Sequence, residues 1–286
     1  MTARPDRRRG VAEAIFADEI GLQFGVYGEF RLWSAYQPIF APQGRTLKAV
    51  AVEALIEPRR VATPVAPQVF FDSVAAPDRL FVETMCRRLH LGNYRNIGVD
   101  GLTLFFNYDP MINDHLGRAL AEIRLMTRHL GDFGLSPAML VCEITEQAAD
   151  EHVLACLVRE MRRDGIQIAI DDFGTGHSTE ARIGLLSPDI VKIDGGWFAE
   201  FCRHAAAERF FRPLVSMLHD RGAKVLVEGI EQATHLRVAL DGGVDLLQGF
   251  HLARPALAGT IFNEEPLSID ALLGMDNKVV PLHQRR

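Results

Sequence analysis

Residues 166–176 read IQIAIDDFGTG, a mostly apolar run that leads straight into Asp171 and Asp172. Such a run is typical of a buried β-strand, and the two glycines that follow it predict a tight loop. A loop of this kind lets both carboxylates face the same side while the backbone stays close to a ligand. Because glycine-rich turns are common, the stretch indicates a fold only if the same unit recurs along the chain.

Seven further apolar runs resemble this one, and segments with helical periodicity separate most of them. The alternation predicts an α/β protein in which a parallel sheet or barrel is covered by helices. Strands are expected at Leu32–Ile39, Ala49–Leu55, Leu102–Asn107, Met139–Glu143, Gln167–Asp171, Asp189–Ile193, Lys224–Val227 and Asp245–Gln248. Eight strands suit one closed barrel, which ordinarily occupies about 200–250 residues as a single domain.

The helical segments are expected at Arg79–Leu91, Asp114–Leu130, Glu151–Asp164, Thr179–Leu186, Glu200–Arg221 and Gln232–Leu240. Gly165, Gly222 and Gly242 follow three of them, where left-handed C-terminal caps are expected. The Pro- and Val-rich segment Glu57–Asp78 has no clear periodicity and predicts a long loop.

Extensions are expected at both ends of the barrel domain, which we place at residues 31–262. Residues 1–30 form an N-terminal extension that is partly helical, because Ala12 to Phe24 is amphipathic. Residues 263–286 form a C-terminal tail with a short helix after Pro266.

Polar residues stand at the C-terminal ends of seven predicted strands. They are Glu53, Asn107, Glu143, Asp171 with Asp172, Lys192, Glu228 and Gln248. Parallel strands of a barrel open their C-terminal ends on one face, so these side chains are expected to meet there. A single acid at a strand end is more often a helix cap or a solvated loop residue, but seven ends in register indicate a site. Asp194 and Glu231, beside the cluster, are expected to be caps or supporting partners.

Carboxylates gathered in this way need positive charge among them, because repulsion and desolvation would otherwise raise their pKa values. Lys192 alone does not balance five of them. Mg²⁺ or Mn²⁺, which favour oxygen ligands, would neutralise the cluster. A pair of such ions bridged by a shared Asp is the recurring device for in-line attack on a phosphodiester.

Composition narrows the class of protein. The formal net charge of −6 argues against a protein that coats a nucleic acid polymer through a basic face. Four scattered cysteines without a C-x-x-C pair indicate reduced thiols. No apolar run of about 18 residues predicts a membrane span, and Glu13, Asp18 and Glu19 interrupt any signal-peptide core, so a cytoplasmic location is expected.

Seven motifs resemble the EAL domain family in order and spacing. They are YQPI at 36–39, VEAL at 52–55, EITE at 143–146, DDFGTG at 171–176, VKID at 191–194, EGIE at 228–231 and QGF at 248–250, followed by Pro255. The likeness covers roughly Arg31 to Phe262, nearly the whole chain.

The resemblance implies a modified TIM (β/α)8 barrel that hydrolyses cyclic di-GMP to linear pGpG with two Mg²⁺ or Mn²⁺ ions, and that Ca²⁺ inhibits. By the same resemblance the ligands of one ion are Glu53, Asn107, Glu143 and Asp171. The second ion is held by Asp171, Asp172 and, through water, Glu228. Lys192 holds the attacking water, Glu146 steadies the loop after the paired aspartates, and substrate contacts come from Gln37, Leu55, Gln248 and Pro255.

The chain departs from the family pattern at several positions, and the largest departure is Glu57. Active members usually carry Arg there, pairing with the ligand's phosphate. An anion at this position is expected to weaken binding by about 1–3 kcal/mol unless Arg59 or Arg60 reaches the phosphate instead. Asp109 stands where a Ser is usual, and residues 177–180 read HSTE in place of Tyr-Ser-Ser-Leu.

The intact acidic set favours an active phosphodiesterase. A second interpretation is a catalytically weak or inactive domain that acts as a cyclic di-GMP receptor or a protein-interaction module, with Glu57 as its main support. A third, a nuclease acting on longer RNA, is disfavoured by the acidic balance. The resemblance is also compatible with a homodimer near the loop after Asp172 and with a separate regulatory protein.

Overall fold

The computed structural model describes residues 10–109, 116–144, 151–174, 180–204, 207–260 and 262–275. Eight strands close into a barrel, which confirms the predicted architecture. They are β3 (Phe30–Gln43), β4 (Thr46–Arg60), β6 (Thr103–Tyr108), β7 (Leu140–Ile144), β8 (Gln167–Phe173), β9 (Ile190–Ile193), β10 (Lys224–Val227) and β11 (Leu246–Leu247).

The expectation that all barrel strands run parallel is wrong for β3. It pairs antiparallel with β4 on one side and with β11 on the other, while the remaining neighbours are parallel. The cause is local, because Gln43 pairs with Thr46 and only a two-residue turn with Gly44 at φ +63° joins the strands. A turn this short can connect only antiparallel strands.

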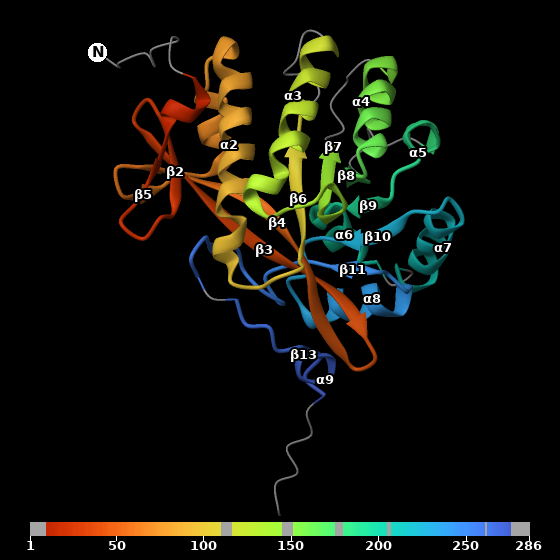
Figure 1. The fold of residues 1–286 in the computed structure, drawn as a ribbon. Coiled ribbons are helices and arrows are strands. Elements are labelled where there is room, and N and C mark those ends of the chain that lie inside the picture. The colour runs from red at the N-terminus through yellow and green to blue at the C-terminus, as the bar shows by residue number, and fades with distance from the viewer. Residues whose placement is uncertain are drawn as a thin grey trace, which may run out of the picture.

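Helices surround the barrel, and in Figure 1 α2, α3 and α4 stand side by side along one flank. They are α2 (Arg79–Asn93), α3 (Leu116–His129), α4 (Glu151–Arg163), α5 (Glu180–Leu186), α6 (Gly195–Phe201), α7 (Ala207–Asp220) and α8 (Ala233–Gly242). The helix predicted at Glu200–Arg221 is in fact two helices, because α6 ends at Phe201 and α7 begins at Ala207. Asp194 accepts a hydrogen bond from the backbone N–H of Trp197 and so starts α6 before the predicted helix.

The glycine caps are confirmed at two of three positions. Gly165 and Gly222 have φ values of +92° and +82°, in the left-handed region. The third expectation is wrong by one residue, since Gly242 is the last residue of α8 and Gly243, at φ +81°, caps the helix.

An antiparallel extension projects from the barrel where a long loop was expected. β4 continues to Arg60 and pairs with β5 (Thr63–Pro64), and α1 (Pro67–Ser73) follows, so the predicted loop at Glu57–Asp78 is mostly ordered structure. On the other side of β3 lie β2 (Gln23–Tyr27) and then β1 (Ile15–Ala17). Within residues 10–30, the described part of the N-terminal stretch, only a single 3-10 turn, Val11–Ala14, is helical.

The extension exists because β3 and β4 are longer than the barrel requires and offer free edges to further strands. One face of it is apolar and is covered by α1 and α2, with a core of Tyr27, Phe30, Leu32, Ile56, Phe70, Val74, Val82, Met85, Cys86 and Leu89. Burial of this face is what stabilises strands that would be marginal alone.

A buried polar network fastens β2 and β3 to α2. Asn93 donates to the carbonyl of Gln23 and accepts from its N–H, both at 2.8 Å. His90 Nδ1 lies 3.0 Å from Ser34 Oγ, and the hydroxyl of Tyr36 donates to the His90 carbonyl at 2.6 Å. Such satisfied contacts fix one register between strand and helix.

His90 makes the stability of the protein depend on pH. Burial, helped by Arg87, lowers its pKa from 6.5 to about 3. The unfolded chain therefore binds a proton that the folded chain does not, and stability is lost as pH falls below 6.5. At pH 5 this one group is expected to remove about 2 kcal/mol from the free energy of unfolding.

Urea unfolding at pH 7 and pH 5 checks this expectation. The His90→Gln variant should lose less stability between the two pH values than the wild type. The matched control is His129→Gln, at an exposed histidine on α3, which should follow the wild type. Equal losses in wild type and His90→Gln would contradict the role of His90.

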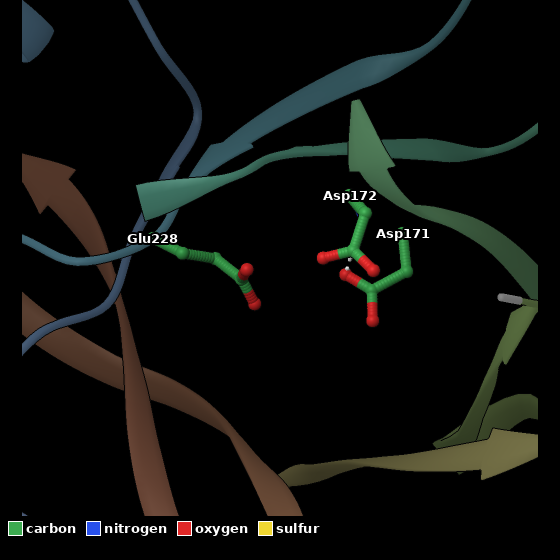
Figure 2. A group of neighbouring side chains, drawn as sticks. All are labelled: Asp171, Asp172 and Glu228. Carbon is green, nitrogen blue, oxygen red and sulfur yellow. Dashed lines mark hydrogen bonds between the residues drawn. The ribbon is translucent and has the colours of Figure 1, made fainter. Parts of the chain in front are cut away.

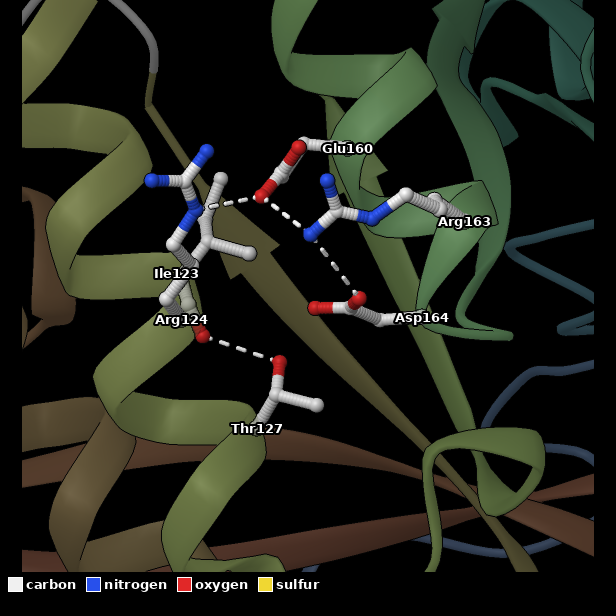
Figure 3. A network of polar contacts seen from close by, with 6 residues as sticks. All are labelled: Ile123, Arg124, Thr127, Glu160, Arg163 and Asp164. Carbon is white, nitrogen blue, oxygen red and sulfur yellow. Dashed lines mark hydrogen bonds and ion pairs between the residues drawn. The ribbon is translucent and has the colours of Figure 1, made fainter.

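An ion network joins α3 and α4, with a buried Glu160 between two exposed arginines, and is drawn in Figure 3. Glu160 Oε1 lies 2.5 Å from Arg124 Nε on α3 and 2.8 Å from Arg163 Nη2, which in turn approaches Asp164. The hydrogen bond from Arg124 lowers the pKa of Glu160. A network at the surface contributes modestly to stability but defines how the two helices sit together.

The C-terminal segments return to the barrel. β12 (Ala256–Leu257) pairs with β3, and β13 (Leu267–Ser268) pairs with the start of β4. The short helix expected after Pro266 is α9 (Ile269–Leu272). Among the described residues, none of the helices is long and apolar enough to cross a membrane.

Candidate functional site

The barrel interior includes two layers of side chains, each with one residue from every strand. The lower layer is apolar and buried, and comprises Ile39, Ala51, Phe105, Val141, Ala169, Ile190, Leu226 and Leu246. Two residues further toward the mouth, on the same face, stand Gln37, Glu53, Asn107, Glu143, Asp171, Lys192, Glu228 and Gln248. In β3 the step runs backwards along the sequence, because that strand is antiparallel.

Lys192 occupies the centre of this polar layer and is only 1% exposed. Its ammonium Nζ lies 2.7 Å from Glu143 Oε1 and 2.7 Å from Glu228 Oε1. Asp171 Oδ1 is 3.2 Å away, and Glu53 Oε1 is 3.5 Å away. The structure therefore brings together carboxylates from four different strands around one cation.

Two glutamines complete the layer on the side of β3 and β11. Gln248 Nε2 donates to Glu53 Oε2 at 2.8 Å, which fixes the orientation of that carboxylate. Gln37 Nε2 donates to the carbonyl of Ala253 at 3.1 Å and so ties β3 to the segment that follows β11.

Asp171 and Asp172 face the same side because the strand is irregular at this point. The pairing of β8 with β9 shifts register between Ile170 and Phe173, and Asp172 has a left-handed φ of +58°. Neighbouring residues of a regular strand would point to opposite faces. The left-handed conformation is strained for a residue with a side chain, by about 1–3 kcal/mol, and strain of this kind gathers at functional sites.

Figure 2 shows the result, with Asp171, Asp172 and Glu228 turned toward a common space. One carboxylate oxygen from each of the three lies within 4.8 Å of the others. Oxygen donors at this spacing form the kind of set that hard divalent cations bind.

The pKa values of the cluster reflect crowded negative charge. Burial, with Glu53 and Asp171 nearby, raises the pKa of Glu143 well above its usual value despite Lys192. Burial also raises the pKa of Glu228, to about 8, and that of Asp172. Burial alone would lower the pKa of Lys192, but the surrounding carboxylates outweigh it and hold that pKa well above the ordinary value.

The charges and the hydrogen bonds both fit two divalent cations. Four carboxylates surround Lys192 and Asp172 adjoins them, so full ionisation leaves four negative charges beyond the one ammonium. Two divalent ions carry that many positive charges. Glu143 lies beside Lys192, but neither of its oxygens has a hydrogen bond of good geometry among the described residues, although both are buried. An unsatisfied buried carboxylate is costly unless an ion completes it.

A cavity of about 400 Å³ opens above the polar layer. Five predicted site residues line it, namely Gln37, Glu53, Leu55, Glu228 and Gln248. Asp194, Gly195, Gly196, Ala199, Gly229, Glu231, Gly249 and Phe250 line it as well. Of these, Asp194 is a helix cap as expected, whereas the glycines and Phe250 were not predicted as site residues.

Glycines belong to this mouth because the loops after β9 and β10 touch through their backbones. A Cβ on Gly195 would lie 2.8 Å from Cα of Gly229, and one on Gly229, at φ +63°, would lie 2.6 Å from Cα of Gly195. Only glycine permits that approach. A glycine-rich loop is a weak sequence signal, so this contact was visible only in the fold.

Arg59 and Arg60, the two candidates to replace the missing arginine, lie on opposite faces of β4 because side chains alternate along a strand. Glu57 and Arg59 lie on the face of β4 that carries Glu53 and Leu55, and Glu57 Oε1 is 2.6 Å from Arg59 Nη2. Arg60 points to the other face, where it pairs with Glu29 at 3.0 Å and lies over the ring of Phe30. Arg59 is therefore the arginine of this pair on the mouth side.

The remaining predicted residues are placed as follows. Pro255 is partly buried in the segment between β11 and β12, next to the carbonyl that Gln37 binds. Asn107 ends the inward row of β6, in register with Glu143. Glu146 and residues 177–179 lie outside the described residues.

Comparisons with known proteins agree with this arrangement. The sequence model of the EAL domain family matches residues 28–255. The biofilm architecture maintenance protein MbaA of Vibrio cholerae is 29% identical over 243 residues, which are 83% of this chain and 30% of that protein. The probable cyclic di-GMP phosphodiesterase PdeA of Escherichia coli is 30% identical over 135 residues, or 46% of this chain and 18% of that protein. The chain thus spans less than a third of the length of these relatives.

A solved structure shares the fold. The YkuI protein of Bacillus subtilis, which has an EAL domain and was solved in complex with its substrate c-di-GMP and calcium, superposes with a TM-score of 0.69 at 25% sequence identity. The superposition covers 85% of this chain and 59% of that one.

Proposed function

This chain belongs to the EAL domain family, and from that premise we propose that it hydrolyses one phosphodiester bond of cyclic di-GMP to give linear pGpG. The observation that carries the proposal is the set of four carboxylates around Lys192, with Asp172 beside them, at the floor of an open cavity. The names of PdeA and of the YkuI complex support the same substrate.

The residues divide into two overlapping ligand sets for Mg²⁺ or Mn²⁺. Glu53, Asn107, Glu143 and Asp171 are proposed to hold one ion. Asp171, Asp172 and Glu228, the last through water, are proposed to hold the other. When bound, the ions would lower the pKa of a water between them and take up charge that develops on the phosphoryl oxygens. The unsatisfied oxygens of Glu143 and the convergence of the other three carboxylates support this division.

The remaining side chains position the reactants. Lys192 is proposed to hold the attacking water and to offset negative charge as the bond to phosphorus forms. Gln248 keeps Glu53 oriented, and Gln37 and Leu55 line the cavity. These two residues and Pro255 are proposed to contact the substrate. Water adds to phosphorus, the bond to the ribose 3′ oxygen breaks, and that oxygen takes up a proton, which leaves pGpG.

Product analysis of the purified protein tests the proposal. With Mg²⁺ or Mn²⁺, cyclic di-GMP is expected to yield pGpG at micromolar enzyme, while Ca²⁺ should support binding without turnover. Absence of pGpG in both metals, with a folded protein that still binds cyclic di-GMP, would instead establish the second candidate, a receptor.

The Glu57–Arg59 pair is the observation that favours the receptor, because it ties up Arg59 on the mouth side of β4. We expect Glu57→Arg to lower the KM for cyclic di-GMP about tenfold, since it removes an anion, frees Arg59 and adds a cation beside the phosphate. Steady-state kinetics measure this change.

A matched control is available on the opposite face of the extension. Glu29 pairs with Arg60 away from the cavity, so Glu29→Arg should leave KM unchanged. Equal effects of the two substitutions would show that Glu57 does not face the bound phosphate.

A further inference from the structure

The outward face of the extension carries a row of aromatic rings. Phe24 on β2 stacks on Trp33 of β3, with ring centroids 4.9 Å apart and planes 26° apart. Phe16 on β1 stacks on the other side of Phe24 at 5.8 Å, and 45% of its surface is exposed. Arg31 lies over the Phe24 ring at 5.6 Å.

The row faces away from α1 and α2. In β3 the even-numbered residues from Phe30 to Tyr36 are buried against that helical layer, whereas Arg31 is exposed and Trp33 is partly exposed. Alternation therefore places Trp33 on the same face as Gln37, which lines the cavity.

Trp33 lies one step beyond the cavity lining along the ladder of β3 and β4. Glu53 is opposite Gln37, Leu55 is opposite Ala35, and Glu57 is opposite Trp33. Each such step of two residues advances about 7 Å, so Trp33 stands about 7 Å beyond Leu55 and about 13 Å beyond the carboxylate ring. The residue between Trp33 and Gln37 on this face is the small Ala35, so no bulky side chain of β3 separates them.

The sheet surface around Trp33, Phe24, Arg31 and Arg59, which we call the rim, differs in charge from the cavity. The cavity is acidic, whereas the rim carries Arg31 and Arg59 beside the rings, with Arg59 held by Glu57 directly across from Trp33. Aromatic faces interleaved with guanidinium groups are what nucleobases with attached phosphates bind.

We propose that Trp33, backed by Phe24, is a positioning residue that stacks on one guanine base of the dinucleotide whose phosphodiester lies among the carboxylates. The inference rests on the proposed function and adds a base-binding rim to it. Backing by Phe24 fixes the indole in place, so little side-chain freedom is lost when a base packs on it.

Calorimetric titration with cyclic di-GMP in Ca²⁺ tests the contact in the absence of turnover. Trp33→Ala is expected to raise Kd by about 5- to 150-fold, the range found when single base-stacking side chains are truncated. Trp33→Phe should recover most of the affinity because it keeps an aromatic face. Phe16→Ala, in the same row but farthest from the cavity, is the matched control and should bind like the wild type.

Two further readouts separate stacking from a structural effect. Indole emission of the wild type should be quenched when cyclic di-GMP binds, and Trp33→Phe, which keeps Trp197, should lose most of that quenching. With Mg²⁺ or Mn²⁺, Trp33→Ala should raise KM and leave kcat within about twofold, since the ring lies far from the reacting bond.

The outcomes distinguish this inference from the function on which it rests. If the wild type neither binds nor hydrolyses cyclic di-GMP, both fall. If the wild type binds but folded Trp33→Ala binds equally well, or if Phe16→Ala weakens binding as much as Trp33→Ala does, only the stacking inference falls.

Discussion

Glu143→Gln is expected to lower the kcat for cyclic di-GMP on the order of 10³-fold while leaving the metal-free protein at least as stable as the wild type. The two effects have one cause. Glu143 is completely buried, and burial together with the neighbouring carboxylates outweighs the ion pair that its Oε1 makes with Lys192 Nζ at 2.7 Å, so the folded protein gains little from its negative charge.

The stability of the variant follows from the raised pKa of Glu143. Burial and the neighbouring carboxylates favour the neutral acid, and Gln has nearly the same shape as that neutral acid. Turnover, in contrast, needs the anion as a metal ligand. A residue that weakens the fold to support function shows this opposite behaviour.

Thermal unfolding in EDTA measures the metal-free stability, and product assays in Mn²⁺ measure kcat. Calorimetry with Mn²⁺ should also show weaker metal binding by the variant. Wild-type turnover in Glu143→Gln would remove Glu143 from the proposed ligand set, whereas a large loss of metal-free stability would mean that its ion pair with Lys192 outweighs the cost of burying its charge.

Lys192→Met is expected to destabilise the metal-free protein by about 3–5 kcal/mol and to abolish turnover. The side chain is buried, and its ammonium lies within 3.5 Å of four carboxylates. Removing the cation at their centre leaves those carboxylates either repelling one another or forced to bind protons.

Metal should rescue stability but not activity in this variant. Mn²⁺ supplies positive charge to the same carboxylates, so the rise in melting temperature on adding Mn²⁺ is expected to be larger for Lys192→Met than for the wild type. Lys224→Met, at an exposed position on the adjacent strand β10, is the control and should change stability by less than about 0.5 kcal/mol. If Lys192→Met melted like the wild type in EDTA, the central electrostatic role of Lys192 would be wrong.

The strands of the barrel were predictable because each is a short apolar run that leads into a polar residue. The direction of β3 was not assigned correctly, although the Gln-Gly-Arg-Thr turn at residues 43–46 contains the necessary signal. The extension was missed for a different reason, since Arg59, Arg60 and the prolines near them gave no periodicity. Those residues form strands because β3 provides an edge for pairing, which is a tertiary effect.

The candidate site was predictable to the extent that it depends on strand ends. Lys192 and the acidic residues of the second layer meet because alternation and barrel closure require it. What the sequence left open depends on backbone conformation and on contacts between distant segments. The left-handed Asp172, the contact between Gly195 and Gly229, and the position of Trp33 at the rim all belong to that group.

The apolar layer beneath the carboxylates limits how water, ions and substrate can reach the site. Eight buried side chains, one from each strand, fill the barrel at that level, so among the described residues we expect water and ions to reach the polar layer from the mouth and not from below. Substrate, product and ions are then expected to enter and leave through the cavity above the polar layer. A dinucleotide bound in this cavity would block release of the metal ions until the product dissociates. Chelators should therefore remove metal from the free protein faster than from the protein with bound dinucleotide.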